Sequence, residues 1–311
     1  MAPWIILAVG AQFILAVVSL IDKYIVTGEK ETPRPFAYAY ITCLMSGASI
    51  VVYALSGLQL PLEGVNFPDI RNIAFPTLTV VAFSFLAAYT FFYGLVSLFS
   101  ALRDSDASDV IPVVGAVSAL CTFALSYAFL GARLSPNFLV GLFLLALGTL
   151  LMSHLRFTWQ IALRALHAGL FFGLHYVTFK GLLGITSFDN AFFWSRIGFV
   201  AVALSLLLVP EYLEKVRTQV KSTDSRSSML VIMNKILAGI GSILILKATE
   251  LGDASVVQAL GGLQFIFILL IGVLFMHKRS KKFGERVTGA EILHKSISIG
   301  LITLGFFVLF V

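Results

Sequence analysis

Two basic residues inside long apolar runs are the first candidates for chemistry in this sequence. Lys235, next to Asn234, lies within 229–248, and Arg196 lies within 191–209. A cation is expensive to bury among apolar side chains, so both are predicted to contact a solute. Lys235 with Asn234 is the stronger candidate for holding an anionic or carboxylate group. The alternative for each cation is that its long side chain reaches the end of the run and leaves the charge in water.

Four further residues complete the predicted solute contacts: His175, Tyr89, Tyr93 and Gln258. An imidazole in the middle of a run could carry a transported proton or bind the solute; its alternative is a hydrogen bond to a neighbouring helix. The two tyrosines are one helical turn apart and predict a cavity lining, unless they only pack. Gln264 points about 120° away from Gln258 on a helix, so only Gln258 is expected to face the cavity.

Other kinds of chemistry find no support in the sequence. Every Asp and Glu is assigned to a connection or to the end of a run, including Asp22 and Asp189, so no buried carboxylate is predicted. Proton coupling would then depend on His175, His167 or a lysine. No phosphate-binding Gly-Lys-Ser/Thr loop, metal-ligand spacing or nucleophile–base pair is present. We therefore expect neither an enzyme nor direct ATP drive, and no cofactor or metal.

The composition indicates which solvent surrounds these candidates. Hydrophobic residues make up 59% of the 311 residues and charged residues 12%, whereas soluble domains carry about 25% charged residues. Only lipid can surround that much apolar surface, which excludes a cytosolic enzyme and a nucleic-acid-binding protein. We expect a multi-pass protein of the plasma (inner) membrane whose partners are a small solute and the bilayer. A homodimer is compatible with the sequence.

The positioning elements are predicted to be ten transmembrane helices in an all-α fold. A span needs about 20 mainly apolar residues. The ten runs are 4–22, 36–56, 73–101, 109–130, 138–154, 159–182, 191–209, 229–248, 255–276 and 296–311.

The sequence repeats itself at two offsets. Eight positions from Gly94 to Gly115 recur 147 residues later with seven identities, and Lys23 recurs as Lys180 at an offset of 157. These offsets predict two five-helix repeats, 1–155 and 156–311. Because five is an odd number, the two repeats would have opposite orientations in the membrane.

Short motifs in both repeats resemble the EamA domain of the drug/metabolite transporter superfamily. They are ALRDSDAS at 101–108 with FLGARLS at 129–135, and ATELGDAS at 248–255 with GERVT at 284–288. The resemblance implies a central cavity between two five-helix halves, and export or exchange of small metabolites by alternating access. The chain departs from the pattern at Ala132, where the family has an acid that the second repeat keeps as Glu285. It also adds a basic segment at 277–282.

Orientation is predicted differently by charge and by resemblance. One face of the ten-span arrangement carries 16 Lys and Arg residues and the other carries 4. The positive-inside rule makes the 16-charge face cytoplasmic and puts both termini outside. The family resemblance implies termini inside.

Together these features predict a secondary transporter of a small metabolite. Buried cations outnumber buried acids in this interpretation, which favours an anionic or zwitterionic solute. The alternative is a non-transporting membrane protein, such as a lipid flippase or a scaffold that uses the basic 278–295 segment on anionic headgroups.

Overall fold

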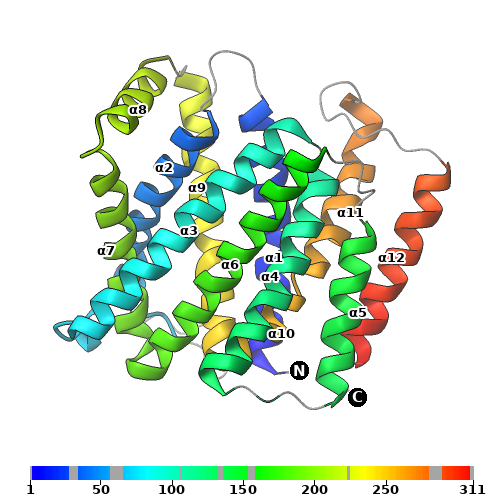
Figure 1. Ribbon diagram of the computed structural model, residues 1–311, viewed down its shortest axis with the longest axis horizontal. Coiled ribbons are helices and arrows are strands. Elements are labelled where there is room, and N and C mark those ends of the chain that lie inside the picture. Colours follow the sequence, from blue (N-terminus) through cyan, green and yellow to red (C-terminus); the bar gives the residue numbers. More distant parts are fainter. Residues whose placement is uncertain are drawn as a thin grey trace.

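The computed structural model is a bundle of helices (Figure 1). It describes residues 2–27, 34–56, 66–105, 107–131, 133, 136–152, 158–222, 225–279 and 289–308, and no strand is assigned within these ranges. The α-helices are α1 Pro3–Thr27, α2 Pro35–Ser46, α3 Leu78–Asp104, α4 Ala107–Leu130, α5 Pro136–Met152, α6 Trp159–Ile185, α7 Phe188–Leu206, α8 Pro210–Ser222, α9 Ser225–Leu251, α10 Ala254–Ala259, α11 Gly262–Arg279 and α12 Gly289–Val308. Two 3-10 helices are η1 Gly47–Leu55 and η2 Ile70–Asn72.

Six of the described helical segments are long and apolar enough to cross a membrane. They are α1, α2 with η1, α3, α4, α6 and α9, and α7 with α8 forms a seventh candidate that is bent by 99°. The apolar helices α5 and α10–α11 are shorter. The helical class is as predicted, whereas ten membrane crossings stay a prediction.

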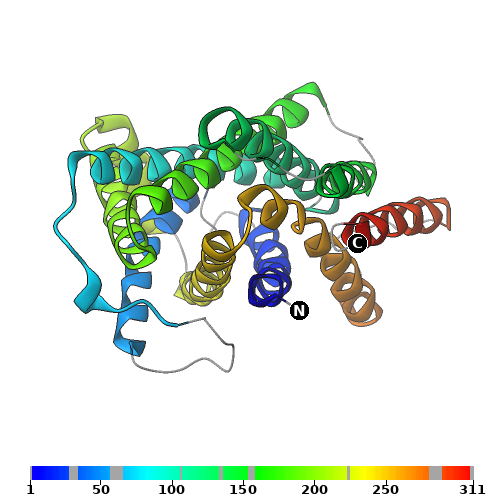
Figure 2. The ribbon, with the colours of Figure 1, turned by 90° about the horizontal axis from the view of Figure 1, so that it is seen from below.

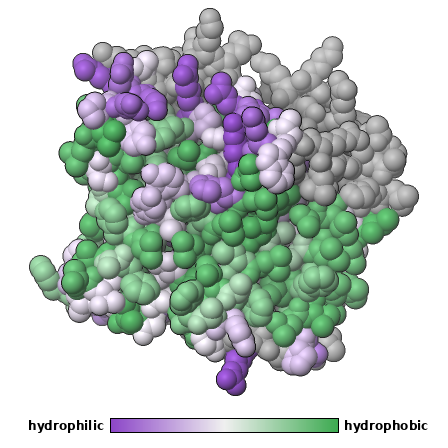
Figure 3. Space-filling model, in the orientation of Figure 1, coloured by the Kyte–Doolittle hydropathy of each residue, from purple (hydrophilic) through white to green (hydrophobic). Residues whose placement is uncertain are grey.

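The arrangement of the helices gives the bundle two distinct ends. Both termini lie at one end, and α8 lies at the other (Figure 1). From the end with the termini, α1 lies between α9 and α11 (Figure 2), and it packs against both. Figure 3 shows hydrophobic side chains over the middle of one face and hydrophilic ones gathered at the end that carries α8. This pattern suits a bundle with a lipid-facing belt.

Two lysines hold helix ends in an equivalent way. The Lys23 ammonium donates to the carbonyl of Ser105 after α3 at 2.7 Å, and the Lys180 ammonium donates to the carbonyl of Gly252 after α9 at 2.9 Å. The lysines are 157 residues apart and the acceptors 147 apart, so the contact follows both sequence offsets. A cation at the C-terminal carbonyls of a helix also opposes the helix dipole.

The close packing of α5 on α12 is likewise repeated. A Cβ at Gly148 would lie 2.9 Å from the backbone nitrogen of Ile302, and a Cβ at Gly305 would lie 2.8 Å from that of Leu145. These four residues form two pairs with a sequence offset of 157. Only glycine lets the two backbones approach this closely.

The structure changes two of the predicted elements. The run 255–276 is interrupted, since α10 ends at Ala259 and α11 begins at Gly262. The first span does not end at Asp22 but continues as helix to Thr27. Ala132, Glu285 and the segment 280–288 lie outside the described residues.

Candidate solute-binding site

A buried polar cluster joins α1, α2 and α9 around Lys235. The Lys235 ammonium lies 3.0 Å from Asp22 Oδ1, and Lys235 is 7% exposed. The same carboxylate oxygen accepts hydrogen bonds from Tyr38 Oη and, at 2.7 Å, from Asn234 Nδ2. The Lys235 ammonium also lies 4.0 Å from the centroid of the Tyr38 ring. One carboxylate therefore organises three helices.

This cluster excludes one alternative and corrects one expectation from the sequence. Lys235 does not snorkel to the membrane surface, because its ammonium is buried in an ion pair. Asp22 is a buried carboxylate, 7% exposed, although none was predicted. The reason is that Ile25 and Val26 extend α1 beyond Asp22 and are themselves buried. Asp22 and Lys235 are 213 residues apart, so no local pattern could pair them.

Asn234 leaves one polar atom of this cluster open. Its Nδ2 faces the Asp22 carboxylate, and its buried Oδ1 makes no hydrogen bond within the described chain. An unpaired buried acceptor is costly unless a donor meets it. The positions that lie 157 residues after Asp22 and 147 residues before Lys235 are Phe179 and Ala88, both fully buried. The fold therefore does not need charge at this place.

Arg196 lies in a second cluster, among aromatic rings. Its guanidinium carbon is 4.7 Å from the centroids of both Phe192 and Phe199, and the residue is 3% exposed. Its Nε has no hydrogen-bond partner among the described residues, and no ion pair of Arg196 is found there. The snorkelling interpretation is wrong for Arg196 as well. Trp194, on the same helix, donates from Nε1 to the Ala74 carbonyl at 3.1 Å.

His175 shares the Phe199 ring with Arg196. The His175 ring lies 6.1 Å from that of Phe199, and its Nδ1 is 2.8 Å from the carbonyl oxygen of Ala87 on α3. A carbonyl can only accept, so Nδ1 carries the proton. This is the hydrogen bond to a neighbouring helix that was the alternative to a solute contact. Nε2 makes no hydrogen bond with a described residue.

The remaining predicted residues make no hydrogen bond or ring contact with Lys235 or Arg196 among the described residues. The Tyr89 and Tyr93 rings pack 4.6 Å apart, and Tyr89 is 43% exposed. Gln258 is buried, with no hydrogen bond from its Nε2 in the described chain. Gln264 instead binds α1, donating to the Leu15 carbonyl at 3.1 Å and to Ser19 Oγ at 2.8 Å. The seven predicted residues thus do not form one continuous constellation.

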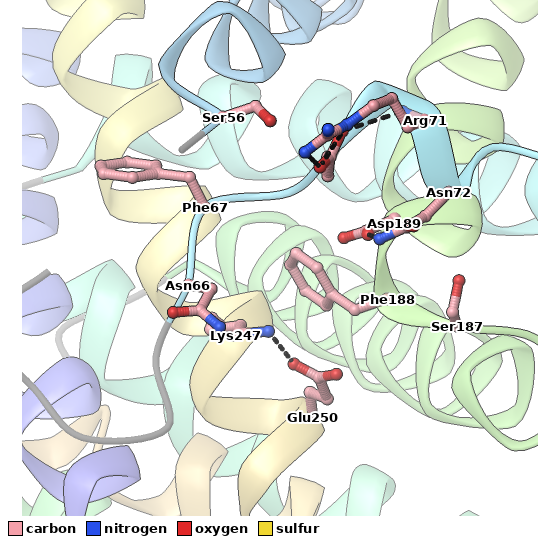
Figure 4. A pocket seen from close by; sticks show the side chains of 11 residues that line it. Ser56, Asn66, Phe67, Arg71, Asn72, Ser187, Phe188, Asp189, Lys247 and Glu250 are labelled. Atoms are coloured by element: carbon pink, nitrogen blue, oxygen red, sulfur yellow. Dashed lines mark hydrogen bonds and ion pairs between the residues drawn. The ribbon is translucent and has the colours of Figure 1, made fainter. Parts of the chain in front are cut away.

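A cleft at the end of the bundle that carries the termini was missed from the sequence. It measures about 470 Å³ and lies between residues 66–72, the start of α7 and the end of α9 (Figure 4). Its charged side chains are Asp69, Arg71, Asp189, Lys247 and Glu250. From the sequence, Arg71 and Lys247 counted only as loop cations. The one sequence signal for this cleft was that acidic and basic residues occur together near the ends of three separate segments.

Two ion pairs line this cleft. Arg71 holds Asp69 at 2.6 Å, and Lys247 holds Glu250 at 2.5 Å. Hydrogen bonds from Arg71 lower the pKa of Asp69 to about 2. The negative charges of Asp69 and Glu250 are each balanced by a neighbouring basic side chain.

Comparisons with known proteins bear on the family and the fold. Residues 2–154 match the model of the EamA-like transporter family. One solved crystal structure aligns over 99% of this chain and 96% of its own chain, with a TM-score of 0.65 and 17% sequence identity. At that identity the similarity shows a shared fold alone. No curated protein sequence matches the chain.

Proposed function

Through residues 2–154 this chain belongs to the EamA-like transporter family of the drug/metabolite transporter superfamily, and we propose that it moves a small zwitterionic or anionic metabolite as a secondary transporter. It is a multi-pass integral membrane protein. We assign the proposed transport to the plasma membrane.

The observation that carries this proposal is the buried Asp22–Lys235 ion pair. Ion pairs inside membrane helices are costly to form, and hydrophobic residues of similar volume often stabilise a protein as well or better. The apolar Phe179 and Ala88 at the equivalent positions illustrate such a replacement. A charged pair at this one place is therefore best explained by a solute that exchanges with its partners.

The chemistry of the cluster favours a zwitterion over a simple anion. An anion that approached Lys235 would also meet the Asp22 carboxylate, 3.0 Å from the same ammonium. A zwitterion could pair its carboxylate with Lys235 and its ammonium with Asp22. The open Asn234 Oδ1 is an acceptor for the same ammonium. Arg196, His175, Gln258, Tyr89 and Tyr93 stay proposed contacts along the solute's path.

Alternating access between two inverted five-helix halves is part of this proposal. The equivalent contacts of Lys23 and Lys180, and of Gly148 and Gly305, support it because each follows the sequence offsets. Ten crossings would also bring both termini to one side, in keeping with their location in Figure 1. The boundary near residue 155 stays a prediction.

Counterflow in proteoliposomes tests the function. Vesicles preloaded with glycine, alanine, phenylalanine, succinate or phosphate would be offered the labelled form of the same solute. We expect accumulation of at least one zwitterion, its loss in Lys235→Met, and full activity in Lys215→Met, which removes an exposed lysine on α8. A scaffold would accumulate none of these solutes, and unchanged transport by Lys235→Met would remove Lys235 from the site.

A further inference from the structure

The cleft at the terminal end of the bundle has a rigid wall. Asn190 on α7 accepts a hydrogen bond from the Ala74 backbone at 2.7 Å and donates to the Asn72 carbonyl at 3.0 Å. The Asn72 side chain in turn donates to Asp189 Oδ2 at 2.7 Å. These bonds fix the segment before α3 onto the start of α7. The cleft is thus preorganised instead of being formed by loosely placed side chains.

The charges of this cleft do not cancel. Asp69 and Glu250 are each paired with a base, whereas among the described residues the Asp189 carboxylate accepts from the neutral Asn72 amide and forms no ion pair. Three acids thus face two bases around the cavity. The excess charge is negative, so the cleft repels a simple anion and attracts a solute that carries an ammonium group.

The cleft also shows how an ammonium group is bound, because the Lys247 side chain contacts an aromatic ring and a carboxylate there. The Lys247 ammonium lies 4.4 Å from the centroid of the Phe188 ring and 2.5 Å from Glu250 Oε2 (Figure 4). A ring face together with a carboxylate is a favourable environment for an organic ammonium. Lys247, whose side chain is 15% exposed, shows that the cleft can hold an organic ammonium group in this way.

We infer that this cleft is a vestibule site for a small solute with an ammonium group, bound through Asp189 and through exchange with Lys247 at Phe188 and Glu250. It contains none of the seven residues predicted to contact the solute. Only the later movement of the solute out of the cleft and across the membrane rests on the proposed function. Binding itself requires no transport.

Calorimetry on the purified full-length protein tests the site with three probes of similar length: pentylammonium, 5-aminopentanoate and pentanoate. We expect the two ammonium probes to bind and pentanoate to bind at least about tenfold more weakly. Asp189→Asn, which keeps an acceptor for Asn72, is expected to weaken both ammonium probes about tenfold. Asp104→Asn, which alters an exposed ion pair with Arg164 on another part of the bundle, is the matched control and should bind as the unaltered protein does.

Several outcomes would overturn the inference. They are equal binding of pentanoate, wild-type affinity in Asp189→Asn, or an equal loss in Asp104→Asn. Glu250→Gln provides a second variant if Asp189→Asn fails to fold, and it should weaken the same two probes. The double variant Asp22→Asn/Lys235→Met separates this site from the proposed transport, because it should lose counterflow and still bind pentylammonium at the cleft.

Discussion

Lys235 and Arg196 are both buried cations, 7% and 3% exposed, yet their surroundings differ. Lys235 has a carboxylate 3.0 Å away, whereas Arg196 lies between two phenyl rings with no carboxylate partner in the described ranges. A guanidinium is more weakly hydrated than an ammonium and stacks on rings, so it tolerates an aromatic cage. The ammonium of Lys235 needs an anion. This difference shows that burial of a cation is not enough to identify a solute-binding site. The presence of an exchangeable ion-pair partner is the distinguishing feature.

The largest effect is expected from breaking the Lys235 pair on one side. Asp22→Leu leaves the ammonium without its carboxylate and should cost about 3–5 kcal/mol of stability. The double variant Asp22→Leu/Lys235→Met removes both charges and should regain most of that loss. Thermal unfolding in detergent, followed by circular dichroism, measures both variants. A double variant as unstable as the single one would show that the pair is a structural requirement.

The helix-capping lysines provide a smaller, symmetric effect. Lys23→Met and Lys180→Met each remove a cation from the carbonyls at the end of one helix, at a cost of about 1–2 kcal/mol. Because the two contacts are equivalent, their losses in unfolding temperature should match closely. A loss confined to one lysine would contradict the equivalence and weaken the comparison between the repeats.

A smaller change still is expected for Arg196. Arg196→Met loses two ring contacts, worth about 2 kcal/mol when desolvated, but it also relieves the burial of a charge that has no ion-pair partner among the described residues, and the two effects oppose each other. We therefore expect an unfolding temperature equal to or above that of the unaltered protein, together with reduced counterflow. Arg196→Lys should not restore transport, since an ammonium cannot stack as the guanidinium does. A marked loss of stability in Arg196→Met would reveal a structural role.

The smallest effect concerns the exposed Asp69–Arg71 pair, a surface counterpart of Asp22–Lys235. Since the pKa of Asp69 is lowered from 3.8 to about 2, its contribution is fully present above pH 3.8 and is lost as the pH falls through about 2. Asp69→Asn should leave the unfolding temperature unchanged at pH 7, because solvent screens this pair. Carboxyl carbon NMR should detect one signal that titrates near pH 2 and disappears in the variant. A signal that titrates near pH 4 would contradict this account.

The sequence predicted much of the fold because its patterns are local or periodic. Apolar runs identified the long helices, and the offset of 157 anticipated the equivalence of Lys23 and Lys180. The break between α10 and α11 was missed because the apolar run 255–276 continues through Gly261 and Gly262 with no charged residue or proline to interrupt it. The bend between α7 and α8 was missed for the same reason, since the hydropathy of a segment does not indicate a change in the direction of the helix axis.

The site was only half accessible to sequence reasoning. Lys235 and Asn234 stood out as polar residues in an apolar run. Asp22 was assigned to a helix end and was therefore not recognised as a buried partner of Lys235. The partner of a buried charge can lie anywhere in the chain, here 213 residues away. The cleft was hidden for a similar reason, because Asp69, Asp189 and Lys247 come from three segments that only the fold brings together.

Counterflow by the charge-neutral variant Asp22→Asn/Lys235→Met tests the central claim most directly. This variant retains hydrogen-bonding groups around Tyr38 and Asn234 and leaves no unpaired charge in this cluster, so its unfolding temperature should stay close to that of the unaltered protein. We expect that such a folded variant no longer accumulates the zwitterion that the unaltered protein moves. Accumulation at the unaltered rate would show that the Asp22–Lys235 pair does not contact the transported solute.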